Sequence, residues 1–359
     1  MGSNDRIEFV APRQRNRARL QLAIFTIAAM VAIAATTPSR ADCVKSTEIK
    51  VQEWPGDIYN LVPWVADAEG LFHQHCLDVK FIPLVGGPPA ISALVSGALD
   101  LANQAPDVNM RPRSKGVDVR MIANMYAGHW SALMAGNQAV LPHVKDGYPA
   151  IMQDLVGKKI GVTVLGGTTE AYMRSAFEGA GLNGSSATYV AIGGLATAVP
   201  ALEHGVVDAE MLGGAGPEIA EAMGVGKIAL DYRIRGVGPK SVQALWGATL
   251  GWHAYGPFID QNPDAIASFT AANNEAISFI KDPKNRSEIY AMISKHMTMP
   301  SGVADPSATL QRIIDVNTNL LGIGVSREAI DGWNAYLVSL NQIPAPIPYD
   351  EIVWRTGRP

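Results

Sequence analysis

The sequence lacks the motifs that most enzymatic mechanisms require. It contains no Gly-x-Ser-x-Gly nucleophile elbow, and no set of Ser, His and Asp residues stands out. The Gly-Gly-Thr-Thr segment at 166–169 lacks the Gly-Lys-Thr/Ser end of a Walker loop and does not fit Gly-x-Gly-x-x-Gly. His73 and His75 are two residues apart without a companion cluster of acidic or His residues, which disfavours a metal site. We therefore expect no catalysis, no cofactor and no metal.

Charged residues are also scarce, at 17% of the 359 residues. The first 41 residues hold six of the 29 basic residues and two of the 33 acidic ones, which leaves 23 basic and 31 acidic residues and a net charge of −8. Nucleic-acid binding needs clustered Lys and Arg, so we expect no nucleic-acid partner. The hydrophobic content of 48% instead predicts a folded chain, long enough for two ordinary domains.

No apolar run reaches the length of about 20 residues that spans a membrane. The apolar run at residues 20–35 follows an Arg-rich segment and precedes the small-x-small pattern of Ser39 and Ala41. This arrangement predicts a cleaved Sec-type signal peptide over residues 1–41, since no Arg-Arg pair marks a twin-arginine signal. An uncleaved membrane anchor is the alternative.

Only two cysteines occur, Cys43 and Cys76. Both follow the predicted signal, so they lie in the exported part of the chain, where a disulfide can persist. Each precedes a predicted strand, and the two sulfurs meet if those strands are neighbours. We expect a disulfide between them, and two free thiols are the alternative.

A pattern that occurs twice organises the remainder of the chain. Gly86 and Gly87 follow an apolar run and precede Ala-Leu-Val-Ser-Gly-Ala-Leu-Asp at 93–100, while Gly193 and Gly194 precede Ala-Leu-Glu-His-Gly-Val-Val-Asp. Each copy is typical of a strand, a glycine-rich loop, a helix, a tight turn and a second strand. The pair predicts two similar α/β units, with a ligand cleft between two lobes. A chance match is the alternative.

Strands and helices alternate along the predicted chain. The predicted strands are 48–53, 77–85, 99–102, 119–126, 159–165, 188–192, 227–230 and 241–252. The predicted helices are 60–71, 90–96, 107–114, 170–180, 263–280, 286–297, 306–320 and 327–340. Such alternation favours mostly parallel sheets, in which ligands bind outside the carboxyl ends of the strands. We expect a crossing between lobes at 136–157 and a surface tail at 343–359.

The loop at 166–169 is the strongest candidate for ligand binding. Its glycines let a ligand approach the backbone, and the following helix offers unpaired N–H groups and the positive end of its dipole. Together with the hydroxyls of Thr168 and Thr169, these groups favour an oxyanion. The alternative is that one of these Thr residues merely caps its own helix.

The other candidates lie in the loops at the same predicted ends of the strands. Aromatic residues there can sandwich a flat or aliphatic ligand, although ordinary core is the alternative for each of them. Gln104 can hydrogen-bond a ligand or belong to a turn, and His129 can contact an anion or be structural. The complete set of predicted ligand contacts is Trp54, Pro55, Gly86, Gly87, Gln104, Tyr126, His129, Gly167, Thr168, Thr169, Gly193, Gly194, Gly213, Gly214 and Trp252.

An ordered series of segments resembles the periplasmic solute-binding proteins of ABC importers. The segments are Pro-Trp-Val-Ala-Asp-Ala-Glu-Gly-Leu-Phe at 63–72, Leu-Asp-Val at 77–79, the segment at 93–100, Asp-Leu-Val-Gly-Lys-Lys-Ile-Gly-Val at 154–162, Gly-Leu at 181–182, and 201–209. More narrowly, the series is similar to the nitrate, sulfonate and taurine group, which includes binders of thiamine pyrimidine precursors.

The resemblance implies an α/β fold of two Rossmann-like lobes joined by hinge crossings, the type II periplasmic binding protein fold. The implied lobes are 43–132 with 241–359, and 137–235, which close on a ligand. The resemblance also implies a periplasmic location and an ABC importer permease in the inner membrane as partner, and we expect a monomer. Gly167, Thr168 and Thr169 are then expected to hold the anionic group of a small ligand.

The expected function is therefore capture of a small organic anion, such as a sulfonate or carboxylate, for an ABC importer. The loops at 86–89 and 212–216 depart from the family pattern, so the ligand need not be a sulfonate. Pyrimidine-precursor binding and a ligand-sensing module for a membrane receptor remain alternatives. A pyrimidine synthase on the same fold is a further alternative, but that class uses a Cys-rich, His-bearing site that this chain lacks.

Overall fold

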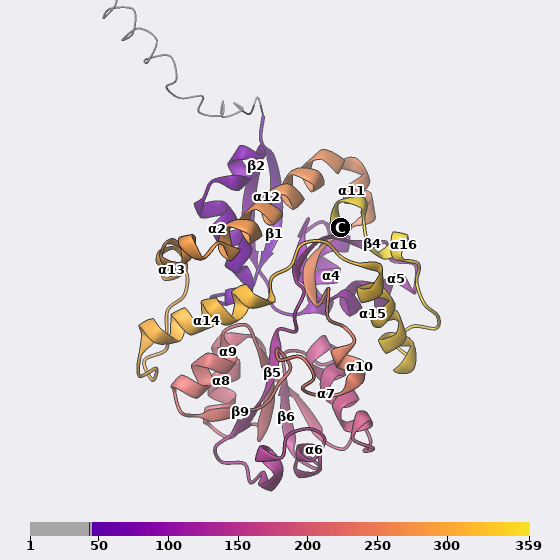
Figure 1. Cartoon of the computed structure of the whole chain (residues 1–359). Coiled ribbons are helices and arrows are strands. Elements are labelled where there is room, and N and C mark those ends of the chain that lie inside the picture. The colour runs from indigo at the N-terminus through magenta and orange to yellow at the C-terminus, as the bar shows by residue number, and fades with distance from the viewer. Residues whose placement is uncertain (1–42, 44) are drawn as a thin grey trace, which may run out of the picture. The chain divides into compact units, whose positions relative to one another are not determined.

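The computed structural model describes residues 43 and 45–359, which form an α/β fold of two lobes, as predicted (Figure 1). The predicted signal peptide at 1–41 lies outside the described residues. Within the described part of the chain, each helix is too short or too polar to cross a membrane.

The first lobe contains two small sheets. Its strands are β1 (Thr47–Glu53), β2 (Leu77–Pro83), β3 (Ala102–Gln104), β4 (Val119–Tyr126) and β10 (Leu250–Tyr255). Strands β1 and β2 are parallel, while β10 lies between β3 and β4 and is antiparallel to both. A bridge between Val51 and Leu101 connects the two sheets.

The helices of the first lobe cover these sheets with their apolar faces. They are η1 (Ile58–Asn60), α2 (Leu61–Ala68), α3 (Leu71–Gln74), α4 (Gly87–Ser96), α5 (Pro106–Arg113), α11 (Gly256–Gln261) and α12 (Pro263–Lys281). Leu61, Val62 and Val65 recur at helical spacing and are buried where α2 packs against α12. The rings of Phe72 and Phe269 stack at 5.6 Å and extend this core.

The second lobe is built on a five-stranded sheet in the order β7-β6-β8-β5-β9. The strands are β5 (Ser131–Gly136), β6 (Lys159–Val162), β7 (Thr188–Ala191), β8 (Ala209–Gly213) and β9 (Gly226–Asp231). The helices are η2 (Pro142–Lys145), α6 (Ile151–Asp154), α7 (Thr168–Gly179), α8 (Leu195–Glu203) and α9 (Gly216–Ala222). Strand β6 is parallel to both neighbours, whereas β5 is antiparallel to β8 and β9.

The sheets are mixed rather than mostly parallel, because β5 and β10 run antiparallel to their neighbours. Both strands follow a crossing between the lobes. The first crossing lies between Tyr126 and Ser131, and the segment at 136–157, predicted as a crossing, instead belongs to the second lobe with η2 and α6. Strand β5 enters the second sheet from the opposite lobe, and β10 returns to the first in the same way. Each therefore runs antiparallel to strands that begin inside their own lobe.

The return crossing also differs from the long strand predicted at 241–252. Its first part is the helix α10 (Lys240–Gln243), and β10 begins only at Leu250. Val242 and Leu245 are both buried and three residues apart, which is the spacing of a helix rather than of a strand. The prediction overlooked this short helical turn.

The C-terminal helices contact both lobes. They are η3 (Pro283–Asn285), α13 (Arg286–Ile293), α14 (Pro306–Leu320), α15 (Arg327–Ser339), α16 (Tyr349–Ile352) and η4 (Arg355–Gly357). Helix α14 passes beside α9, where Arg312 pairs with Glu221 at 2.6 Å (Figure 1). On α15 the Tyr336 hydroxyl lies 2.9 Å from the Ser175 hydroxyl, which belongs to α7.

The tail at 343–359 is not the surface segment that was predicted. Ile352 and Val353 are fully buried, and the backbone N–H of Trp354 donates to the Met121 carbonyl on β4 at 2.8 Å. The Pro-rich composition indicated an irregular backbone. Composition alone does not show whether such a backbone is exposed or pairs with a strand.

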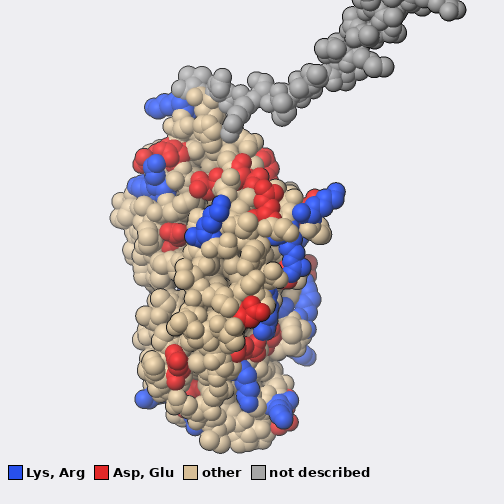
Figure 2. Space-filling model, turned by 90° about the vertical axis from the view of Figure 1, so that its left-hand side faces the viewer, with Lys and Arg blue, Asp and Glu red and all other residues tan. Residues whose placement is uncertain are grey.

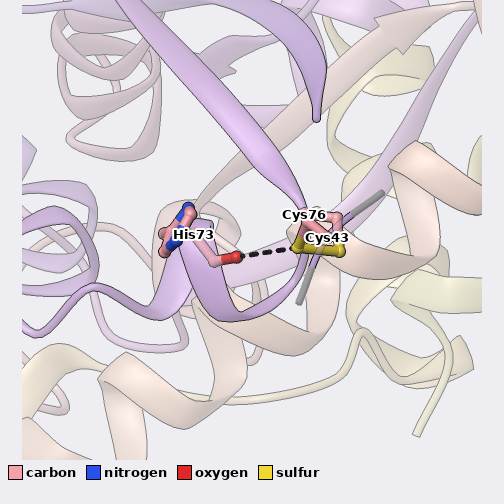
Figure 3. The surroundings of a disulfide bond; sticks show 3 residues. All are labelled: Cys43, His73 and Cys76. Atoms are coloured by element: carbon pink, nitrogen blue, oxygen red, sulfur yellow. Dashed lines mark hydrogen bonds between the residues drawn. A yellow bond between two sulfur atoms is a disulfide. The ribbon is translucent and has the colours of Figure 1, made fainter. Parts of the chain in front are cut away.

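A disulfide joins Cys43 to Cys76 and confirms the predicted pairing (Figure 3). Their Cα atoms are 5.4 Å apart, because β1 and β2 are neighbours in register from Thr47 and Leu77 onward. The Cys43 sulfur lies 3.3 Å from the His73 carbonyl oxygen at the end of α3. The bond therefore fixes the start of the described chain to the turn between α3 and β2.

A buried carboxyl group lies at the centre of the second sheet. Glu210 on β8 is fully buried, and neither carboxyl oxygen has a hydrogen-bond partner among the described residues. Burial raises its pKa to about 9. The folded state therefore keeps Glu210 protonated at neutral pH, whereas an unfolded chain loses this proton near pH 4.5.

Reduction of the disulfide should lower the free energy of unfolding by about 4 kcal/mol, because the bond closes a loop between residues 33 apart. Urea unfolding with and without dithiothreitol measures this difference. A Cys43→Ser/Cys76→Ser control should be insensitive to the reductant. Two free thiols in denatured, unreduced protein would contradict the disulfide.

Glu210 should make stability fall as pH rises from about 5 to 9, since the unfolded chain binds fewer protons there. The slope contributed by this group is up to about 1.4 kcal/mol per pH unit. Urea unfolding of Glu210→Gln across this range should show a shallower decline than wild type. Glu203→Gln, at an exposed position of the same lobe, is the matched control and should leave the slope unchanged. Equal slopes in wild type and Glu210→Gln would refute the assignment.

Candidate functional site

A cavity lies between the two lobes and encloses about 430 Å³ that no atom fills, part of it open to solvent. Most of its lining comes from loops at the ends of strands in both lobes. The lining residues are Trp54, Tyr59, Gly86, Gly87, Gln104, Ala105, Trp130, Thr163, Val164, Gly167, Thr168, Thr169 and Leu250. The location is the one expected of a ligand site in an α/β protein, outside the carboxyl ends of the strands.

A second cavity of about 360 Å³ adjoins the first. The two share Trp54, Tyr59 and Thr163 as a common wall. The remaining lining residues of the second cavity are Asp57, Ile192, Gly193, Gly194, Leu195, Ala198, Met211, Leu212 and Gly213. The two cavities form one site with two compartments.

Aromatic side chains make the wall of this site. The Trp54 and Tyr59 rings are 5.2 Å apart, and the edge of Tyr59 meets Trp130 at 5.7 Å. A hydrogen bond fixes each indole. The Trp54 indole N–H donates to the Asn103 carbonyl at 3.3 Å, and that of Trp130 donates to the Thr249 carbonyl at 3.1 Å. These contacts give the site a fixed apolar surface that suits a flat or aliphatic ligand.

The first turn of α7 faces the first cavity. Gly167 is the N-cap and has an extended backbone, and no side chain caps the helix. Thr169 Oγ1 accepts a hydrogen bond from the Thr163 N–H at 3.1 Å, while Thr168 Oγ1 donates to Asp107 at 2.8 Å. The alternative that these hydroxyls cap their own helix is therefore not what the structure shows. Among the described residues, the Thr168 and Thr169 N–H groups have no acceptor.

The first turn of α4 approaches the same cavity from the other lobe. Gly86 has a φ of +93°, a conformation that glycine adopts at little cost, and Gly87 begins the helix. A Cβ at Gly87 would lie 2.6 Å from the Val108 side chain, so only glycine fits this contact. Pro88 and Pro89 carry no N–H, which leaves Gly87 as the donor of this turn.

No Lys or Arg lines either cavity within the described chain, and Asp57 is the one acidic residue that does. Arg111 lines neither cavity; it pairs with Asp107 and donates to the Gly166 carbonyl at 2.5 Å. Burial lowers the pKa of this guanidinium. On the face shown in Figure 2, basic and acidic side chains are interspersed among broad uncharged areas. Positive potential in the site therefore comes from backbone dipoles rather than from cationic side chains.

The structure brings many of the predicted contacts together. Those that line the first cavity are Trp54, Gly86, Gly87, Gln104, Gly167, Thr168 and Thr169, and those that line the second are Gly193, Gly194 and Gly213. The predicted residues that line neither cavity are Pro55, Tyr126, His129, Gly214 and Trp252.

These five residues lie in the core, in an exposed turn or at the contact between the lobes instead. Trp252 is fully buried under α12, where its ring N–H donates to Asn273 at 2.9 Å. The buried Tyr126 donates to Asn317 at 2.9 Å, and His129 contacts the Val242 carbonyl at 2.7 Å. Burial lowers the pKa of His129 to about 4, so it is a neutral core residue rather than a cationic anion ligand. Pro55 is exposed in its turn, and Gly214 lies against Asp57.

Sequence reasoning missed Asp57, Thr163 and Val164 as lining residues. The sequence signal for Asp57 was its place in the Trp-Pro-Gly-Asp loop directly after the first strand. Thr163 and Val164 immediately follow β6, which ends at Val162 rather than at the predicted Leu165. A correct strand end would have placed both in the loop that faces the ligand cavity.

Comparison with family models gives one match, over residues 62–286, to the family described as NMT1/THI5 like. This match spans more than half of the chain. No curated protein matches the sequence.

Several solved structures have a similar fold. A Bordetella bronchiseptica RB50 protein is 23% identical, with a TM-score of 0.66 over 84% of this chain and 90% of that one. The alkanesulfonate-binding protein SsuA from Xanthomonas axonopodis pv. citri, bound to MOPS, is 15% identical, with a TM-score of 0.68 over 87% and 99%. The periplasmic nitrate-binding protein NrtA from Synechocystis PCC 6803 is 15% identical, with a TM-score of 0.54 over 84% and 92%. The chain shares the fold of these periplasmic binding proteins.

Proposed function

Because the chain belongs to the NMT1/THI5-like family, we propose that it is a periplasmic solute-binding protein that delivers a small organic anion to an ABC importer. The main support for the proposal is that the N-terminal ends of two helices line the same cavity. Helix α4 of the first lobe and α7 of the second both direct their first turns at the same space. Unpaired N–H groups and the positive ends of helix dipoles favour a negative charge there.

The composition of the first cavity also supports an organic anion. Its lining contains no carboxylate, so nothing there repels a negative group. Trp54, Tyr59 and Trp130 offer an apolar wall for the body of the ligand. SsuA is described as alkanesulfonate-binding and NrtA as nitrate-binding, so anions are the ligands named for two proteins of this fold.

An enzymatic role has little support from the chain. Its two cysteines form the disulfide, so no thiol is available to a synthase-like active site. In the described part of the chain, no group of three or more His, Cys, Asp and Glu side chains is arranged to hold a metal ion. Binding without catalysis, by a monomer that docks on an inner-membrane permease, is the simplest function for this architecture.

The ligand class can be tested by a thermal-shift screen of alkanesulfonates, carboxylates and nitrate. A ligand that binds only the folded state raises the melting temperature, and a concentration of 100 Kd adds about 2.7 kcal/mol of stability. We expect at least one anion to stabilise the protein and sodium chloride at equal ionic strength to have no such effect. Stabilisation by pyrimidines alone would replace the anion proposal with pyrimidine-precursor binding.

Thr168→Pro tests whether the start of α7 binds the anion. Proline is tolerated at the first helical position and the extended Gly167 suits a following proline, so the change removes one N–H without breaking the helix. Loss of a hydrogen bond to a charged group should weaken binding of the best anion by roughly 10-fold or more.

Thr168→Ala is the matched control, because it removes the same hydroxyl but keeps the N–H. Isothermal titration calorimetry of both variants with the stabilising anion separates the two effects. Equal affinities of the Pro and Ala variants would show that this N–H does not contact the ligand.

A further inference from the structure

The lobes contact each other directly through a carboxyl group. Asp57, in the loop after β1 of the first lobe, accepts a hydrogen bond from the Ala215 N–H of the second lobe at 3.1 Å. The Asp57 side chain is only 5% exposed. The bond therefore lies in the closed interface between the lobes and contributes to their closed arrangement.

Two glycines make room for this contact. A Cβ at Gly214 would lie 2.1 Å from Asp57 Oδ1, and a Cβ at Gly213 would lie 1.9 Å from the Tyr59 hydroxyl. We call Gly213 and Gly214 the glycine seat. Any larger residue at either position would prevent the loop at 57–59 from reaching the second lobe.

We propose that Asp57 is a latch for lobe closure, which the glycine seat receives when the two lobes meet. The latch deepens the proposed function, on which it rests, because closure is what retains a captured ligand. Asp57 also lines the second cavity, but as a latch it is a positioning residue that acts through the geometry of the cleft.

The charged and titratable groups around Asp57 give the latch a pH dependence. Burial raises the Asp57 pKa to about 7 in the closed protein, against the backbone hydrogen bonds that lower it. Glu218 of α9 raises it further, while Glu218 itself is paired with Arg233 at 2.9 Å. Tyr59 and Tyr126 also face this carboxyl, and burial keeps the pKa of both phenols well above 10, so they stay neutral.

Closure is consequently coupled to proton uptake. In an open cleft Asp57 meets water and loses its proton near pH 4, whereas in the closed cleft it keeps that proton up to about pH 7. The ratio of closed to open protein should fall as pH rises, by up to tenfold per pH unit between about 5 and 7, and level off above this range.

Single-molecule fluorescence energy transfer in the ligand-free protein tests this coupling. Dyes on Ser96→Cys and Ala196→Cys report the distance between lobes, since both positions are exposed and the native cysteines are joined in the disulfide. The closed fraction should be highest at pH 5 and decline by pH 8. Asp57→Asn, which keeps the shape and the acceptor oxygen, should remove most of that decline. An unaltered pH profile in Asp57→Asn, or a wild type that is open at every pH, would overturn the proposal.

Gly214→Ala tests the seat independently of pH. The methyl group should clash with Asp57 and lower the ratio of closed to open protein at least tenfold. Gly214 has a φ of +56°, so the control is Gly224→Ala in the same lobe, which has a φ of +68° and no atom within 4 Å of the added Cβ. Equal closed fractions in the two variants would refute the seat.

These measurements use no ligand, so their outcome is independent of the anion screen. Failure of the screen with a working latch would reject the anion proposal alone. A stabilising anion with no effect of Asp57→Asn or Gly214→Ala on closure would reject the latch alone.

Discussion

The site depends on the hydrogen bonds that join the two crossings between the lobes. The Thr249 N–H donates to the Tyr126 carbonyl at 2.8 Å, and the Gly247 N–H to the Ala127 carbonyl at 2.7 Å. The Trp130 indole adds a third bond, to the Thr249 carbonyl. Two crossing segments that are hydrogen-bonded side by side restrict the relative orientation of the lobes far more than one would. The loops of the two lobes therefore face the same space, and the Trp130 indole, one of the bonding groups, is itself a wall of the cavity.

Several elements could be predicted from the sequence because they carry local signals. The signals are glycine pairs after apolar runs, apolar residues at helical spacing, and prolines at helix starts. The predicted bounds of β4 and α14 are the same as those in the structure. The features that the sequence did not predict depend on pairing between distant segments. A strand was predicted at 241–252, but its place between β3 and β4 depends on those neighbours. The tail at Val353 likewise depends on β4, so neither pairing could be inferred from local periodicity.

The same division holds for the site. Gly87 and Thr168 line the cavity, as expected of glycine-rich loops that lead from a strand into a helix, and their contact with a ligand stays a prediction. Trp252 and His129 lie in the core and line neither cavity. Aromatic and imidazole side chains suit a core and a cleft equally well, and only the packing decides between them. The contact of Asp57 with Ala215 could not be predicted, because the partner is 158 residues away and contributes a backbone N–H, which no sequence motif records.

The order of strands along the chain has a consequence for folding. The sheet of the second lobe uses one continuous stretch, from β5 to β9, whereas the first lobe needs β10, which is made after the whole second lobe. Since β10 is the central strand between β3 and β4, the three-stranded sheet of the first lobe is incomplete until then, although the pair β1-β2 needs only N-terminal residues. A chain emerging from its N-terminus would complete its second lobe first, and the lobe begun first would be finished last.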